Sequence, residues 1–194
     1  MEDHVRNLLL LGVLSWTTAF LLIRKSLPNR SFEFCNRLVS TTHAILAVTL
    51  SSLSVEDWKC PVCPVALKSS PQQMRALAVS LSYLIYDLVC CLFDKQFSLD
   101  NCFHHLVSII GIGAGLVYEK CGSELVAALW VTELSSPFLH LRELLKELGY
   151  KDTDLNLAAD IMAVGLQLVS AFWFYKIARM VKYKLTKRNN LKVA

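Results

Sequence analysis

Residues 101–115 read Asn-Cys-Phe-His-His-Leu-Val-Ser-Ile-Ile-Gly-Ile-Gly-Ala-Gly, which places two adjacent histidines in an otherwise apolar run. Ionisable side chains are costly inside a membrane-spanning segment, and they usually face the interior of a helix bundle or a wet cavity. At about 3.6 residues per turn, His104, Ser108 and Gly111 share one helix face. His105 lies about 100° around the same helix. The stretch therefore predicts a spanning helix with a polar face directed at other helices.

Composition points to a membrane protein. Of the 194 residues, 54% are hydrophobic and 19% are charged, which is more apolar and less charged than soluble averages. Apolar runs of roughly 17 to 22 residues recur between short polar segments, as is typical of multi-pass membrane proteins. Much of the net charge of +4 comes from the tail after the last run, where basic residues suit anionic lipid heads. We expect membrane lipids as partners and no nucleic acid.

The apolar runs predict an all-α integral membrane protein, with a single domain over residues 1–194 and six transmembrane helices. The predicted spans are 5–23, 32–53, 74–93, 101–118, 125–141 and 155–175. A cleaved signal peptide is the alternative for the first span, but the start Met-Glu-Asp-His lacks the usual basic residues. Six spans put both termini on one side. The 20 Lys and Arg residues divide into twelve on that side and eight on the other, which predicts cytosolic termini.

Five of the six predicted spans carry a stripe of polar side chains. We predict that the stripes meet around a polar-lined cavity that is open to lipid. The predicted lining residues are His43, Tyr86, Ser108, His140 and Asp160. The candidates for catalysis are the titratable residues His104, His105, Asp87 and Glu133. Asp87 lies deep enough in its span to need a hydrogen-bond partner or a proton.

The alternative reading of these stripes is that they hold the helices together, at about 0.6–2 kcal/mol for each polar group. We favour that reading for Ser40, Ser108, Asn36 and Gln167. For His104, Asp87 and Glu133 we favour chemistry, because an amide or hydroxyl would give the same adhesion at a lower cost. Several convergent titratable groups are typical of acid–base work, and an imidazole can also accept an acyl group.

Three local features shape the predicted bundle. Pro137 removes a backbone hydrogen bond within the fifth span, so we expect a kink that exposes carbonyl groups near Glu133. Residues 142–155 are expected to form a charged turn and loop at the membrane interface. The glycines of the fourth span allow close helix approach, and their lack of bulk beside the histidines would also suit a slot for a lipid chain. These are Gly111, Gly113 and Gly115.

We expect no metal site from the histidines. His104 and His105 are adjacent and cannot easily point at one ion from a single helix, and no histidine pair has the i, i+4 spacing of zinc-binding helices. Cys60 and Cys63 form a single C-x-x-C pair with prolines around it. In a cytosolic loop they would be free thiols or acylation sites, and in a luminal loop they would form a disulfide. The other five cysteines suit buried small hydrophobic positions.

Four sequence pieces in order resemble the TLC-domain family, the six-span fold shared by ceramide synthases and translocating-chain-associated membrane proteins. The pieces are Ser40-Thr41-Thr42-His43, Tyr86-Asp87, His104-His105-Leu106-Val107-Ser108 and Glu133-Leu134-Ser135-Ser136-Pro137-Phe138. The resemblance covers residues 28–187, with one more helix before them. It is closest to the small transmembrane TLC proteins. It implies a TLC-type bundle in the endoplasmic reticulum and a role in lipid metabolism or homeostasis.

Ceramide synthases transfer an acyl group from acyl-CoA to a sphingoid amine, using their paired-histidine region. By resemblance, His104 or His105 would lie nearest that chemistry, and acyl-CoA would be the co-substrate. The synthases carry a later motif that ends in His-Asp with a further Asp, whereas residues 133–137 here read Glu-Leu-Ser-Ser-Pro. We therefore expect a protein that binds or processes an acyl-chain lipid and is not a ceramide synthase. The alternative is a non-catalytic protein that binds lipids or proteins in sorting or membrane organisation.

Overall fold

The computed structural model describes most of the first 150 residues and part of the remainder. The described residues are 2–62, 67–93, 99–150, 154, 157–162, 164–166, 168, 171, 172, 175 and 179. For residues 2, 99–101, 103 and 104 the description covers the backbone and not the side chain.

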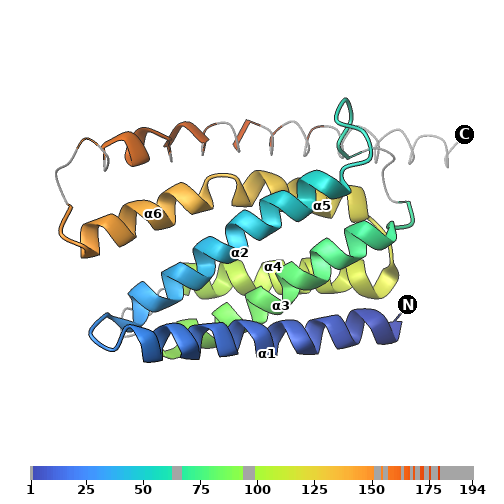
Figure 1. Ribbon diagram of the computed structural model, residues 1–194. Coiled ribbons are helices and arrows are strands. Elements are labelled where there is room, and N and C mark those ends of the chain that lie inside the picture. The colour runs from blue at the N-terminus through green and yellow to red at the C-terminus, as the bar shows by residue number, and fades with distance from the viewer. Residues whose placement is uncertain are drawn as a thin grey trace, which may run out of the picture.

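The described chain is helical and contains no strand, which confirms the predicted all-α class. The helices in order are α1 (Glu2–Ser26), α2 (Phe32–Ser54), α3 (Pro71–Phe93), α4 (Leu99–Tyr118), α5 (Gly122–Glu133) and α6 (Ser136–Glu147) (Figure 1). The described residues between 154 and 179 are also helical, in the region predicted as the last span. An isolated bridge joins Lys68 to Lys120 in the loops at one end of the bundle.

Helix α3 is the centre of the bundle, in contact with α1, α2, α4 and α5. Most of its side chains from Gln73 to Asp87 are buried, and Leu77 and Ala78 are completely inaccessible. Small residues let α1 come close, because a Cβ added to Gly12 would lie 2.3 Å from the hydroxyl of Ser82. Trp16 of α1 donates a hydrogen bond of 3.2 Å to the same hydroxyl. The first predicted span is therefore a packed helix of the bundle.

The outer surface of α1 is apolar. Leucine side chains such as Leu11, Leu14 and Leu22 are about 60% exposed, which is the pattern of a surface that faces lipid. Among the described residues, Asp3–Ser26 and Pro71–Phe93 form helices long and apolar enough to cross a membrane. A shorter apolar helix covers His105–Tyr118. The count of six spans stays a prediction.

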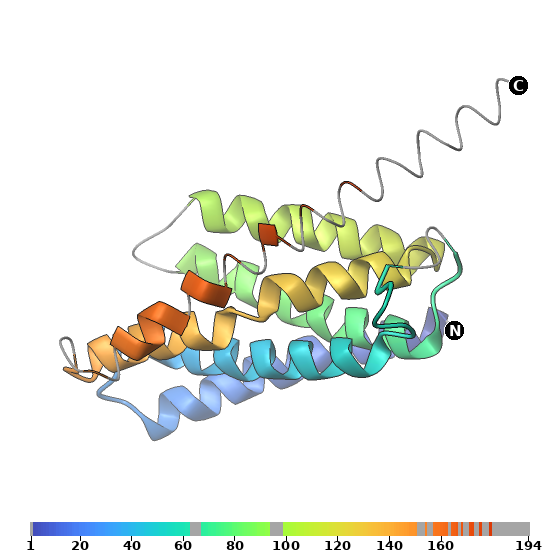
Figure 2. The same cartoon turned by 90° about the horizontal axis from the view of Figure 1, so that it is seen from above.

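The fifth predicted span is interrupted. Helix α5 ends at Glu133 and α6 begins at Ser136, and the two follow each other end to end (Figure 2). The cause is Pro137, which lies in the first turn of α6, where its missing N–H group is tolerated. The backbone N–H groups of Phe138 and Leu139 both bond to the carbonyl of Ser135. The predicted kink near Glu133 is confirmed as a break in the helix.

The predicted turn and loop from residue 142 is wrong for residues 142–147, which are helical, whereas its place at the membrane interface stays a prediction. Helix α6 continues past Leu141 to Glu147, because its apolar side chains Leu144 and Leu145 are buried against the bundle. It stops at Gly149, whose φ of +94° lies in the left-handed region that glycine adopts at little cost. The N–H of Tyr150 then bonds to the carbonyl of Leu145 and closes the helix.

Both views place the N-terminus at the same end of the bundle as the loop between α2 and α3 (Figures 1 and 2). Cys60 in this loop is disulfide-bonded. A disulfide at Cys60 is what the sequence predicts if this loop is luminal. Cys63 lies outside the described residues. Of the other cysteines, Cys35 and Cys90 are buried as expected, whereas the remaining three are only half-buried.

Candidate functional site

The centre of the candidate site is the carboxylate of Asp87 on α3, which is buried among three helices. Its Oδ2 atom lies 3.1 Å from Nε2 of His105 on α4. Its Oδ1 atom accepts a hydrogen bond of 2.9 Å from the side-chain amide of Asn36 on α2. A buried carboxylate is costly unless it is paired and hydrogen-bonded, and Asp87 has one partner at each oxygen.

Two tyrosines extend this network along α2 and α3. The hydroxyl of Tyr86 donates to the side-chain oxygen of Asn36 at 2.7 Å, and that of Tyr83 donates to Ser40 at 2.8 Å. Asn36 and Ser40 are four residues apart on α2, so they lie on one face and meet the tyrosines on successive turns. The network crosses the helix interface as a continuous row of hydrogen bonds.

His43 lies one turn further along α2, in an aromatic environment. Its ring stacks on Tyr83 with centroids 3.7 Å apart, and Trp16 meets it edge-on at 5.9 Å. The side chain is 1% exposed, and its Nε2 atom has no hydrogen-bond partner. An unpaired polar atom in such a place costs free energy. His43 is therefore enclosed by aromatic rings, and it follows Asn36 and Ser40 on the same face of α2.

His105 is held at both ring nitrogens. Nε2 faces Asp87, and Nδ1 lies 3.7 Å from the sulfur of Cys91, one turn further along α3. A histidine fixed in this way has a defined ring orientation. His104 belongs to the same helix, but its side chain lies outside the described residues. Its part in the site stays a prediction.

Further titratable side chains surround the Asp87–His105 pair. Glu133 lies close enough to interact electrostatically with both members of the pair, and its carboxylate is within hydrogen-bonding reach of Ser136. His43 and His140 also interact electrostatically with Asp87. The structure thus brings together residues from α2, α3, α4, α5 and α6, all within the low-dielectric interior where such interactions are strong.

Asp160 stands apart from this group. Its carboxylate lies 3.3 Å from the guanidinium of Arg142, which also pairs with Glu143 at 2.7 Å. These side chains are about 30–40% exposed, so the pair is one that contributes little to stability. Asp160 therefore links α6 to the C-terminal helical residues and makes no described contact with the Asp87–His105 pair.

A cavity of about 160 Å³ lies between α3, α4 and α5. Its polar lining residues are Ser108, Thr132 and Glu133, and Leu84 and Gly111 are among the others. Two residues that the sequence placed at the site, Ser108 and Glu133, therefore line one space. Because Glu133 also interacts with the Asp87–His105 pair, this space lies beside the polar network.

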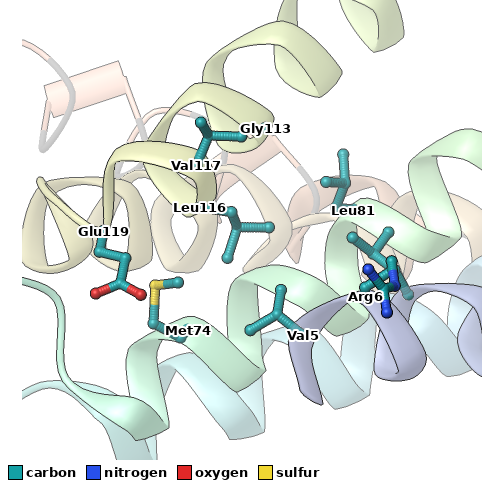
Figure 3. Close-up of a pocket in the computed structure, with 9 residues that line it drawn as sticks. Val5, Arg6, Met74, Leu81, Gly113, Leu116, Val117 and Glu119 are labelled. Atoms are coloured by element: carbon teal, nitrogen blue, oxygen red, sulfur yellow. The ribbon is translucent and has the colours of Figure 1, made fainter. Parts of the chain in front are cut away.

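A second cavity, of about 280 Å³, lies between α1, α3 and α4 (Figure 3). Its walls are mainly apolar, with Leu116 and Val117 on one side and Val5 on the other. Arg6 and Glu119 are its charged lining residues. The prediction was one cavity with polar walls. The two cavities described here are mainly apolar, and several of the polar side chains bond to each other, so the single polar-lined cavity stays a prediction.

Sequence reasoning missed one cluster. Asp87, Cys91 and His105 each offer a ligand atom within 4.8 Å of the other two, a separation typical of a metal site. From the sequence, metal binding was considered only for the two adjacent histidines and, as a weak zinc signal, for Cys60 and Cys63. The signal was the four-residue spacing of Asp87 and Cys91 and the three-residue spacing of Cys102 and His105, which put each pair on one helix face.

The family follows from comparison with known proteins. A family model described as the TLC domain matches residues 27–164, which include α2 to α6. The chain belongs to the TLC domain family. Family members are membrane proteins linked to lipid metabolism, so the exposed apolar helices of this chain are those of an integral membrane protein.

One relative is TLC domain-containing protein 4-B of Danio rerio. It is 26% identical over 163 residues, which cover 80% of this chain and 58% of the relative. This chain therefore spans little more than half of that protein. No solved structure matches the chain. The resemblance inferred from the four sequence pieces is confirmed.

Proposed function

We propose that this protein binds an acyl-chain lipid inside the membrane, in the cavities on either side of α4. The observation that carries the proposal is the open space at two glycines. A Cβ added to Gly111 or to Gly113 would meet no atom within 4 Å, and each glycine lines one of the two cavities. Glycine costs about 1 kcal/mol relative to alanine inside a helix. Packing does not require glycine at these positions, whereas room for a ligand would.

Gly115 provides the contrast on the same helix. A Cβ there would lie 2.1 Å from Leu125, so this glycine serves the close approach of α4 and α5. Gly111 and Gly113 have no such role. The mainly apolar walls beside them match the chemistry of an acyl chain, and the carboxylate and hydroxyl groups at the smaller cavity would suit a polar lipid head.

The enzymatic form of the proposal adds His104 as a general base or acyl acceptor. As a base, its imidazole would take the proton of a lipid hydroxyl or amine. The oxygen or nitrogen would attack the carbonyl of acyl-CoA and displace the CoA thiolate, which would take up the proton. Glu133 is the carboxylate left to orient His104, because Asp87 is paired with His105. His105, held at both nitrogens, would then position the helix.

A second function is favoured by the network itself. Asn36, Ser40, Tyr83 and Tyr86 bond to one another across α2 and α3, which is what polar residues do when they hold membrane helices together. On this view the protein binds lipids or other membrane proteins in sorting, without chemistry. Both forms are compatible with an endoplasmic reticulum membrane and cytosolic termini, which the basic tail supports.

The test is lipidomics on the purified protein and on cells that make it. Replacing Gly111 or Gly113 with leucine would put a side chain into a cavity at a position where its Cβ meets no neighbour, so we expect a co-purifying acyl lipid in the wild type and at least a tenfold loss in these variants. Gly165→Leu is the matched control, because this glycine also faces open space and lines neither cavity. Equal lipid content in all four proteins would refute the proposal.

A further inference from the structure

The pair of helices α3 and α4 brings four metal-ligating side chains together near one end of the bundle. Helix α3 contributes Asp87 and Cys91, and α4 contributes Cys102 and His105. Spacings of four and three residues put each pair on one face of its helix. Cys102 is outside the group of three ligand atoms that lie within 4.8 Å of one another, but it is close enough to Cys91 to interact with its thiol, so the two faces meet.

The distances suit a metal ion. Nε2 of His105 lies 3.1 Å from Asp87 and its Nδ1 lies 3.7 Å from the sulfur of Cys91. Zinc bonds of about 2.0–2.3 Å at tetrahedral angles put neighbouring ligand atoms roughly 3.3–3.8 Å apart. One ligand atom from each of these three residues lies within 4.8 Å of the others. Only one ring nitrogen of His105 can bind the ion, so the imidazole would have to rotate slightly to bring that nitrogen close to both Asp87 and Cys91.

The carboxylate is already oriented from outside the cluster. Asn36 donates to Oδ1 of Asp87 and leaves Oδ2 facing His105, and the hydroxyl of Tyr86 fixes the amide of Asn36 in turn. Metal-ligating carboxylates and histidines usually have such outer partners, which set the direction of the ligand atom. Asp87 has such outer partners from both α2 and α3, through Asn36 and Tyr86.

We propose that Asp87, Cys91, Cys102 and His105 bind one divalent cation of the zinc class. Two thiolates and an imidazole are borderline-soft ligands, which favour zinc over magnesium or calcium. Four protein ligands would leave no open position, so the ion is structural and fixes the ends of α3 and α4 together. Binding would release the two thiol protons to solvent. The inference does not depend on lipid binding.

The rival for the same residues is a disulfide between Cys91 and Cys102. Both thiols are free and half-buried in the structure. Two thiols in contact within an oxidising compartment would join, unless a metal ion holds them as thiolates. The experiment must therefore separate bound metal, free thiols and a disulfide.

The test uses the full chain, purified under reducing conditions in detergent and titrated with Zn²⁺ and with Co²⁺. We expect about one ion per chain, and a thiolate-to-cobalt absorption band in the near ultraviolet. The double variant Cys91→Ser, Cys102→Ser should lose the band and bind at least tenfold more weakly. Asn36→Ala, which removes the outer partner of Asp87, should weaken binding about 10–100-fold.

Cys90→Ser is the matched control, because Cys90 is a buried free thiol next to Cys91 and outside the cluster. It should bind the ion as the wild type does. Circular dichroism checks that each variant keeps its helices. No bound ion in the reduced wild type, binding unchanged in the double variant, or a Cys91–Cys102 disulfide in protein alkylated before lysis would each overturn the proposal. Lipid content, measured on the same samples, tests the proposed lipid binding independently of metal binding.

Discussion

His104 is the residue whose replacement best separates chemistry from adhesion. Under the enzymatic form of the proposal, His104→Ala should lower the lipid product in cells by at least about 10²-fold, the usual contribution of a general base, and leave the fold intact. His104→Asn keeps hydrogen bonding and lacks a basic nitrogen, so it should be equally inactive. The measurements are product levels by lipidomics and thermal unfolding of the purified variants. A folded His104→Asn protein with wild-type product would assign His104 to packing.

Individual residues also show what the sequence could predict. The helical period put Asn36 and Ser40 on one face of α2 and Tyr83, Tyr86 and Asp87 on one face of α3, and these side chains do meet. The period could not say whether His104 or His105 faces Asp87. The two differ by about 100° around α4, and the rotation of a helix is set by all its neighbours at once.

Helix α1 depends on one close contact with α3. Gly12→Val should drive a branched side chain into Ser82, since even a Cβ would lie 2.3 Å from its hydroxyl. Overpacking of this kind costs about 1–3 kcal/mol, so the variant should unfold at a lower temperature and expose α1 to protease. Leu14→Val, two residues along and 64% exposed, is the control and should change neither property. Wild-type stability in Gly12→Val would mean that α1 does not pack against Ser82.

The glycines and the proline show how far helix-level prediction reached. The sequence assigned close approach to three glycines of α4, but only Gly115 makes such a contact, and Gly12 was missed. A glycine pattern gives no information on which face meets a neighbour. For Pro137 the missing N–H predicted a distortion, and the break at Leu134 and Ser135 followed. The sequence did not predict the extension of α6 to Glu147, because that extension depends on the burial of Leu144 and Leu145 against the bundle.

The bundle as a set of apolar helices was the most predictable property. Long apolar runs can only be satisfied in lipid as helices, which fixed the class and the positions of α1 to α4. The cavities were less predictable. Polar stripes suggested one wet centre, yet hydrogen bonding among Asn36, Asp87 and the tyrosines consumes most of those groups. Space remains where glycines meet larger apolar neighbours, which depends on the relative positions of three helices.

The orientation in the membrane is the last prediction, and two observations bear on it in opposite directions. The basic residues after the last helix place both termini in the cytosol. The loop that contains Cys60 lies at the same end of the bundle as the N-terminus, and Cys60 is disulfide-bonded, which would require an oxidising compartment. The seven basic residues from Lys176 to Lys192 give the larger bias, so we keep the prediction of cytosolic termini.

We expect the loop that contains Cys60 to lie in the cytosol, on the same side as the termini. A membrane-impermeant maleimide, added with a membrane-impermeant reductant to cells with a permeabilised plasma membrane and an intact endoplasmic reticulum, should label Cys60. Cys60→Ser is the control for the site of labelling, and a protease-accessible tag at the C-terminus should be cut under the same conditions. If Cys60 reacts with the same reagents only after the inner membranes are opened, and the tag is protected, the termini are luminal. The Asp87–His105 pair would then lie nearer the cytosolic side, where Cys91 and Cys102 would stay reduced without a metal ion.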